Sequence, residues 1–127
     1  MGDCPFCVAS PERMLVVGRL AMSISDAYPV SPGHTLIVPK RHVASFFEAT
    51  DEERSELLAL LDSSRLALIR RYRPSGFNVG INDGSAAGQT VMHLHIHLIP
   101  RYLGDKPDPR GGVRWIFPEK ADYWSLK

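Results

Sequence analysis

Three histidines occupy alternate positions in one short stretch of the chain, VMHLHIHLIPR. They are His93, His95 and His97, with a leucine and an isoleucine between them. A period of two residues is typical of a β-strand, because successive side chains point to opposite faces. The pattern therefore predicts a strand over residues 91–99, with the histidines displayed on one face and the aliphatic residues buried on the other.

Three histidines on one face are compatible with three kinds of role. The first is a chance or pH-sensitive cluster, since most single histidines are structural. The second is a metal site, because a His-x-His pair on a strand can bind zinc, and three histidines with a water form a catalytic zinc site. The third is nucleophilic catalysis on phosphorus, in which one neutral imidazole attacks and a second histidine serves as the acid.

The residues just before the histidines favour the third role. Gly84, Gly88, Gln89 and Thr90 belong to a glycine-rich segment with amide and hydroxyl donors, which suits a phosphate group. Residues 84–104 contain no carboxylate, the side chain that commonly orients a metal-bound histidine. We therefore expect imidazole to attack phosphorus, and the reactive P–N bond to be broken by water, with no metal required for catalysis.

A second group of metal-type residues lies near the N-terminus. Cys4 and Cys7 are the only cysteines, and their Cys-x-x-Cys spacing is a weak zinc signal. A redox pair is an alternative, although the βαβ context of such pairs is missing, and two free thiols are another. A structural zinc needs four ligands, and His42 and His93 are the remaining candidates.

The elements that must position these residues are strands interrupted by one long helix. Thr50 and Glu53 have the spacing of a capping box at the start of that helix, and Pro74 and Gly76 end it. Its apolar face is expected to contain Leu57, Leu58, Leu61, Ala67, Leu68 and Ile69. Strands are expected over residues 14–18, 20–24, 35–39, 77–82 and 91–99, and a helical turn or two over 43–48. This order predicts an α+β domain with a mostly antiparallel sheet.

Length and composition limit the class of protein. The chain has 127 residues, near the usual size of one domain, with 15 Lys and Arg against 14 Asp and Glu. Near neutrality argues against a general binder of nucleic acid or membrane surfaces. Neither a signal peptide nor an apolar run of the roughly 20 residues needed for a transmembrane helix is seen. We expect a cytoplasmic protein with a single domain over residues 1–127.

Taken together, the motifs resemble those of the histidine triad (HIT) family. HLHIHLI matches the family pattern His-φ-His-φ-His-φ-φ, with φ hydrophobic, at all seven positions, and PGHTLIVPKRH and IND…GQT resemble the family too. The resemblance covers residues 4–102 and is to bacterial members related to dinucleoside polyphosphate hydrolases. His97 stands where the related galactose-1-phosphate uridylyltransferases have glutamine, which disfavours a nucleotidylyltransferase of that type.

The resemblance implies a five-stranded, mostly antiparallel sheet with one long and one short helix, in a homodimer that joins two sheets into one. It implies attack by His95 on the α-phosphate of a purine nucleotide, such as a diadenosine polyphosphate or an AMP conjugate, with a covalent nucleotidyl-histidine intermediate. His97 would lie near the scissile phosphate and assist the leaving group. Other implied substrate-binding residues are Asp26, His34, Asn82, Gly88, Gln89 and Thr90.

Three of these residues also have a simpler interpretation. Asn82 and the following Asp83 and glycine are compatible with a hairpin turn, Asp26 with a solvated loop, and His34 with a turn. For the activity, an adenylyl-amine (phosphoramidate) hydrolase is an alternative, as is a nucleotide-binding signalling protein with little turnover. In the zinc-bearing subset of the family, the positions of Cys4, Cys7, His42 and His93 supply a structural zinc site.

The C-terminal stretch, residues 105–127, is rich in proline and glycine and contains Trp115 and Trp124. It is expected to be either a surface tail packed by its tryptophans or a flap over the substrate or the dimer partner. Arg110 and Arg114 are compatible with phosphate contacts, but isolated arginines are usually solvated.

Overall fold

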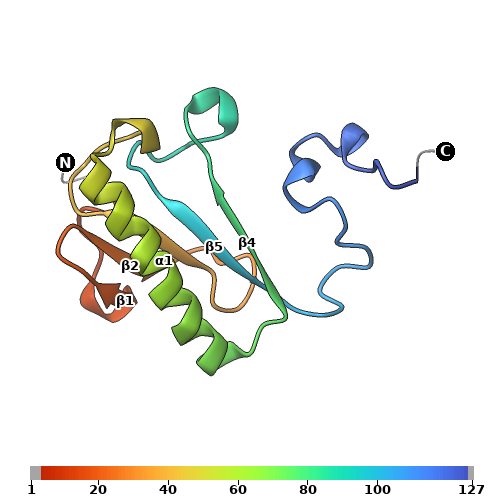
Figure 1. Ribbon diagram of the computed structural model, residues 1–127, viewed down its shortest axis with the longest axis horizontal. Helices are drawn as coiled ribbons and strands as arrows, with labels where there is room; N and C mark the ends of the chain where they lie inside the picture. Colours follow the sequence, from red (N-terminus) through yellow and green to blue (C-terminus); the bar gives the residue numbers. More distant parts are fainter. Residues whose placement is uncertain (1–3, 126–127) are drawn as a thin grey trace.

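The structure is a computed structural model that describes residues 4–125. Five strands form one antiparallel sheet in the order β1-β2-β3-β5-β4, and one helix, α1, lies across one face of it (Figure 1). The elements are β1 (Met14–Val17), β2 (Ala21–Ser25), β3 (Thr35–Pro39), α1 (Asp51–Tyr72), β4 (Gly76–Ile81) and β5 (Ile96–Arg101). The α+β fold with a five-stranded antiparallel sheet and one long helix is thus confirmed. The short helix expected over 43–48 is a single 3-10 turn, Phe46–Glu48.

Helix α1 begins and packs as its sequence requires. The Glu53 amide donates to the Thr50 hydroxyl at 3.0 Å, and the Thr50 amide donates to the Glu53 carboxylate at 2.9 Å, so the capping box is confirmed. The helix buries a leucine stripe against the sheet. Leu58, predicted for this stripe, is 56% exposed, because it lies one residue round the helix from buried Leu57. The core under the helix includes Ile37, Leu57, Leu60, Leu68, Leu94, Ile96 and Leu98.

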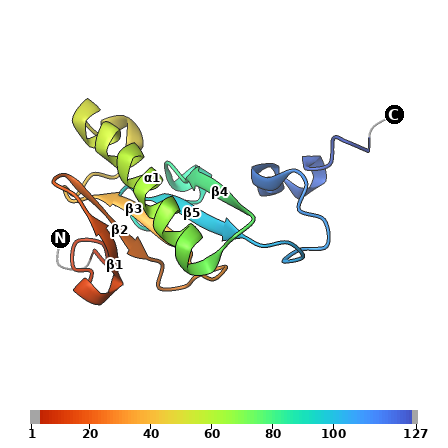
Figure 2. The same ribbon diagram turned by 60° about the horizontal axis from the view of Figure 1, so that its bottom comes forward.

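The opposite face of the sheet has a second apolar core. The N-terminal segment that carries the two cysteines covers β2 and β3 there, while α1 covers the other face (Figure 2). Strand register explains the division, because directly paired residues share a face: Leu36 pairs with Ile24 and with His97. This second core consists of Cys4, Phe6, Met22, Ile24, Leu36 and Val38.

The histidine stretch differs from the expected strand in one respect. Strand β5 begins only at Ile96, so His93 and His95 precede it, and the amide of Leu94 donates to the carbonyl of Val43 at 2.7 Å instead of to a neighbouring strand. Alternation nevertheless continues through the stretch, and its aliphatic residues enter the core under α1, as predicted. His93 and His95 are not displayed: they are 0% and 8% exposed, because the N-terminal segment covers them, whereas His97 is half-buried.

Beyond β5 the chain leaves the sheet. Residues 102–125 form two short 3-10 turns, Gly112–Ile116 and Pro118–Lys120, which lie apart from α1 in both views (Figures 1 and 2). Arg110 stacks over Trp124 at 4.7 Å, so its guanidinium is engaged within the segment. No helix in the described part of the chain has the length and apolar character needed to cross a membrane.

Candidate active site

A hydrogen bond to the backbone determines which ring nitrogen of His95 carries the proton. Its Nδ1 lies 2.8 Å from the carbonyl oxygen of His93, so Nδ1–H donates there and Nε2 keeps its lone pair. The same ring borders a pocket of about 300 Å³ that is also lined by His97, Asn82 and Thr90. An imidazole with a bound proton on one nitrogen and a free lone pair on the other is prepared to act as a nucleophile.

His97 is oriented by a chain of two further residues. The amide of Val30 donates to His34 Nδ1 at 3.2 Å, which leaves the His34 proton on Nε2. That Nε2 lies 3.0 Å from His97 Nδ1 and 3.4 Å from a carboxylate oxygen of Asp26. His97 Nδ1 therefore accepts, and its own proton is on Nε2. Beside the His95 lone pair, the site thus holds an imidazole N–H donor.

Burial keeps these imidazoles neutral. Burial, with the neighbouring His95 and His34, lowers the pKa of His97 to about 4. Burial also lowers the pKa of His34, and the carboxylate of Asp26 offsets this only in part. Near pH 7 both rings therefore carry a single proton, which is the state required for the hydrogen-bond chain just described.

The glycine-rich loop forms one wall of the pocket. Gly84 and Gly88 have φ values of 95° and 93°, a region that favours glycine, and they bracket the 3-10 turn Ser85–Ala87. Gly88 lines the pocket beside Thr90. The buried Gln89 side chain accepts from the Gly84 amide and donates to two carbonyls within hydrogen-bond distance, those of Ala44 and Val91. Its amide is therefore engaged in shaping the loop.

The sequence did not decide whether Asn82 and Asp83 belong to a turn or to the site, and the structure gives their side chains different surroundings. The carboxylate of Asp83 accepts from the Ser45 hydroxyl at 3.1 Å and from the Phe46 amide at 3.0 Å, so it ties the loop to the segment before α1. Asn82 is exposed and lines the pocket with His97. Only Asn82 of the two is therefore placed to contact a ligand.

The four predicted zinc ligands, which include the first histidine of the triad, come together in the structure. Cys4 Sγ lies 3.4 Å from His93 Nδ1, Cys7 Sγ lies 3.3 Å from His42 Nδ1, and the two Nδ1 atoms are 3.1 Å apart. All four ligand atoms lie within 4.8 Å of one another. Bond lengths of 2.0–2.3 Å in a tetrahedral zinc site put neighbouring ligand atoms about 3.3–3.8 Å apart, so the residues fit zinc.

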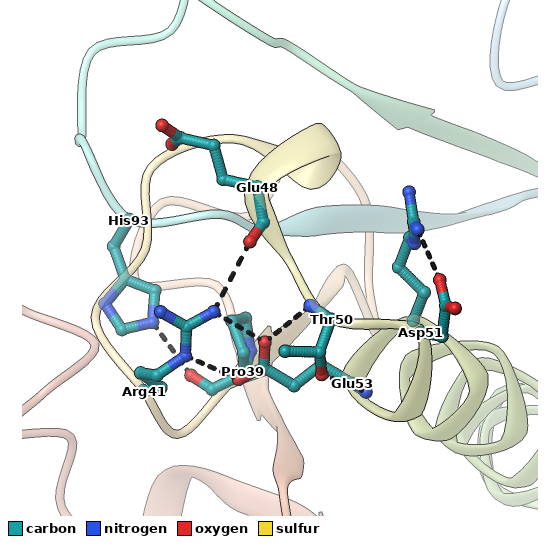
Figure 3. Close-up of polar contacts among 8 residues, drawn as sticks. Pro39, Arg41, Glu48, Thr50, Asp51, Glu53 and His93 are labelled. Atoms are coloured by element: carbon teal, nitrogen blue, oxygen red, sulfur yellow. Dashed lines mark hydrogen bonds and ion pairs between the residues drawn. The ribbon is translucent and has the colours of Figure 1, made fainter.

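Neighbouring groups hold these ligands in place. His93 Nε2 lies 2.8 Å from the Pro39 carbonyl, so its N–H donates there (Figure 3). The Nδ1 lone pair is therefore left on the side of the two cysteine sulfurs. The residue before His42 is tied to the start of α1, because Arg41 donates to both carboxylate oxygens of Glu53, at 2.8 and 3.0 Å (Figure 3). Hydrogen bonds from Arg41 and from the Thr50 backbone lower the pKa of Glu53 to about 2.

Two residues that the sequence did not single out also border the pocket. Phe6, between the two cysteines, is buried, and its ring lies 5.0 Å from the His95 ring and 5.7 Å from the His93 ring. Its position between Cys4 and Cys7 could have been used to predict that it lies near His93. Arg13 lines the same pocket from the turn before β1, and nothing in its local sequence indicated this.

Comparison with known proteins agrees with this geometry. Residues 9–104 match the HIT domain. An AP-4-A phosphorylase of Mycobacterium tuberculosis is 41% identical over 99 residues, which cover 76% of this chain and 51% of that protein. A bis(5'-nucleosyl)-tetraphosphatase [asymmetrical] of Schizosaccharomyces pombe is 34% identical over 87 residues, 68% of this chain and 48% of that protein. The chain therefore spans about half the length of these two relatives.

One solved structure is similar over most of its length. The crystal structure of a zinc-bound histidine triad family protein from Mycobacterium smegmatis superimposes with a TM-score of 0.75 at 32% identity, covering 84% of this chain and 81% of that one. The fold of this chain is thus the fold of a histidine triad family protein. The chain belongs to the HIT family.

Proposed function

We propose that this protein is a nucleotide hydrolase that attacks the α-phosphate of a dinucleoside polyphosphate or a related purine nucleotide through His95. The observation that carries the proposal is the assignment of protons at the triad. His95 Nε2 holds a lone pair, and His97 Nε2 holds a proton, at one pocket. Two relatives that share the family are named for enzymes acting on such compounds, which supports the substrate class.

In this proposal the reaction has two steps. His95 Nε2 forms a bond to phosphorus, and the anhydride P–O bond breaks, with its electron pair leaving on the polyphosphate. The Nε2–H of His97 donates a hydrogen bond to that leaving oxygen. Gly88, Thr90, Asn82 and Asp26 line the pocket. Gly88 and Thr90 are proposed to lie at the phosphate with Asn82 beside them, and Asp26 is proposed to hold the ribose. Water then attacks phosphorus, breaks the P–N bond and returns the electron pair to His95.

The pKa of His97 favours an anhydride over an amine leaving group. Because that pKa is lowered to about 4, His97 is not a cation near pH 7 and assists by hydrogen bonding rather than by full proton transfer. A polyphosphate leaves as an anion and needs no proton, whereas an amine must be protonated as it leaves. The phosphoramidate alternative is therefore the second candidate, and its turnover is expected to rise as the pH falls.

Two molecules can accept the nucleotidyl group from His95 in the second step, water or inorganic phosphate. The relative with 41% identity is named as a phosphorylase, so inorganic phosphate is a candidate acceptor in place of water. Water would give a nucleoside monophosphate and phosphate would give a nucleoside diphosphate. Product analysis in the presence of phosphate distinguishes the two acceptors without any change to the first step.

Zinc is proposed as a structural ion held by Cys4, Cys7, His42 and His93. When bound, it would cross-link the N-terminal segment to the loops before α1 and β5 and so supply rigidity rather than catalysis. All four ligands come from the protein, which leaves no open position for a reacting water. We also propose a homodimer built on β4, the outer strand next to β5, whose edge is available to a second copy.

The test is turnover of a panel of nucleotide anhydrides and phosphoramidates by the full chain and by His95→Ala. The variant is expected to lose at least about 1,000-fold in kcat while it still binds nucleoside monophosphate. Substrate labelled at the α-phosphate should leave its label on His95 in quenched wild-type enzyme. Normal turnover by the variant, or a label on another residue, would reject the mechanism. Binding without turnover of any compound would favour the signalling alternative.

A further inference from the structure

Arg13 lies at the pocket with hydrogen-bonding capacity that the protein does not use. It precedes β1 and lines the pocket together with Asp26 and Tyr28. Its Nη2 donates to the carbonyl of Ser25 at 2.8 Å. Its Nε is the one buried side-chain nitrogen or oxygen between residues 4 and 125 without a hydrogen-bond partner. A buried N–H without an acceptor is unfavourable, and because Arg13 lines a pocket, a ligand bound there is a candidate source of the acceptor.

The strand register gives the spacing between the backbone that Arg13 contacts, at Ser25, and the strand that carries His97. Ser25 on β2 pairs with Thr35 on β3, and Thr35 pairs with Leu98 on β5, the residue after His97. Two strand spacings amount to about 10 Å. That span is comparable with the reach of a nucleotide from its α-phosphate to the outer edge of its base. With phosphate at the triad, a nucleotide that crosses these two strands in the pocket can bring its base edge to Arg13.

The surroundings of Arg13 suit a base better than a second phosphate group. The pocket between Arg13 and the histidines is lined by the buried apolar side chains of Phe6 and Leu36, which match the flat faces of a base. Asp26 lines the same pocket, so the guanidinium shares the pocket with a carboxylate and already donates to a backbone carbonyl. These acceptors reduce its attraction for another anion but leave its free N–H groups available to a neutral acceptor.

We propose that Arg13 reads the edge of the base and selects a 6-oxopurine, guanine or hypoxanthine, over adenine. The proposal rests on the proposed function and adds its base preference. A guanidinium only donates hydrogen bonds. Guanine and hypoxanthine present two acceptors, O6 and N7, on one edge, which match paired N–H groups, whereas adenine replaces one acceptor with an amino donor. Tyr28 lines the same pocket and is exposed, so its ring is available to a bound base.

Binding and turnover test the proposal separately. Titration of GMP, IMP and AMP into His95→Ala, which cannot react, is expected to give roughly tenfold or tighter binding of GMP and IMP than of AMP. Turnover of the matching dinucleoside tetraphosphates by the active enzyme should show the same order in kcat/KM. Similar affinities for GMP and IMP would show that the O6 and N7 edge is recognised, because guanine and hypoxanthine share these two acceptors and differ only in the 2-amino group.

Two substitutions at Arg13 assign the preference to this side chain. Arg13→Gln is expected to remove or reverse it, since glutamine can both donate to N7 and accept from the amino group of adenine. Arg13→Lys keeps the charge and should lose most of the preference. The matched control is Arg19→Gln, an exposed arginine in the turn between β1 and β2, which should leave the GMP to AMP ratio unchanged. Melting temperatures confirm that each variant is folded.

The outcomes separate this proposal from the proposed function. Equal affinity for GMP and AMP in the protein with wild-type Arg13, or an unchanged ratio in Arg13→Gln, would overturn the base preference while turnover persists. An equal loss for all three nucleotides, growing with the number of phosphates, would instead identify Arg13 as a phosphate contact and also overturn it. Absence of turnover with every tetraphosphate, together with a preserved preference for GMP in binding, would reject the proposed hydrolase activity. The role of Arg13 in base selection would then still hold.

Discussion

Two clusters of ligand-type side chains flank the triad, and they differ in the direction of their protons. The sulfur cluster contains Cys4, Cys7, His42 and His93, and the carboxylate cluster contains Asp26, His34 and His97. In each, the ligand atoms lie within 4.8 Å of one another. The first turns a histidine lone pair inward, because the outer nitrogen of His93 donates to the Pro39 carbonyl.

The carboxylate cluster has the reverse arrangement. The amide of Val30 donates to the outer nitrogen of His34, so the inner nitrogen carries the proton and has no lone pair to offer a metal. That N–H donates to His97, and the carboxylate of Asp26 lies beside it. The comparison teaches that residue type does not separate a cluster suited to a metal from a hydrogen-bond chain. The backbone group behind each imidazole decides between them.

Loss of a sulfur ligand should have the largest effect. Cys4→Ser is expected to lower bound zinc from about one per chain to near zero and to lower the melting temperature by roughly 10 °C or more, since binding energy of a structural zinc is folding energy. Metal analysis and thermal unfolding measure this. Asp26→Asn is the matched control from the other cluster and should keep its zinc. A variant that retains zinc and stability would show that Cys4 is not a ligand.

Removal of the donor at His97 should affect chemistry and spare the metal. His97→Gln is expected to reduce kcat by roughly 100- to 1,000-fold, because the donor to the leaving oxygen is displaced. Its zinc content should equal that of the wild type. Steady-state kinetics together with metal analysis provide the two readings. A parallel loss of zinc and activity would mean that the two clusters act as one site.

The lowered pKa of His97 predicts a dependence of stability on pH. Between pH 6.5 and about 4 the unfolded chain binds a proton at His97 that the folded chain does not, so stability falls as the pH is lowered through that window and this contribution then levels off. In His97→Gln that contribution is absent. Melting curves from pH 4 to 7 should therefore fall less in the variant, by roughly 5 °C over the window. Parallel curves for the two proteins would contradict the assignment.

The smallest effect is expected at His34, which acts through His97. His34→Gln should lower kcat by about two- to tenfold, the size expected from one hydrogen bond that orients a reacting group. As a positioning residue it should shift the pH dependence of kcat and leave zinc content and the affinity for nucleoside monophosphate nearly unchanged. A loss as large as that of His97→Gln would instead place His34 in contact with the substrate.

Local sequence was sufficient for the parts of the fold that local forces determine. The capping box at Thr50 begins α1 because two side-chain and backbone pairs within four residues satisfy each other. The alternation through residues 94, 96 and 98 sent aliphatic side chains to the core under the helix. The candidate residues of the triad and of the sulfur cluster came from spacing and family resemblance, which require no knowledge of contacts.

The exposure and the protonation of those residues depended on the tertiary structure. His93 was expected on a displayed face and is buried, because Phe6, 87 positions earlier, covers it. Arg13 and Ser25 come together only through the arrangement of β1 and β2, and no local pattern marks Arg13 as part of the pocket. The tautomer of each imidazole is set by a carbonyl or amide contributed by the folded backbone. Such partners are defined by distance in space, so the sequence determined which imidazoles are available and only the folded chain determined which nitrogen of each is free to react.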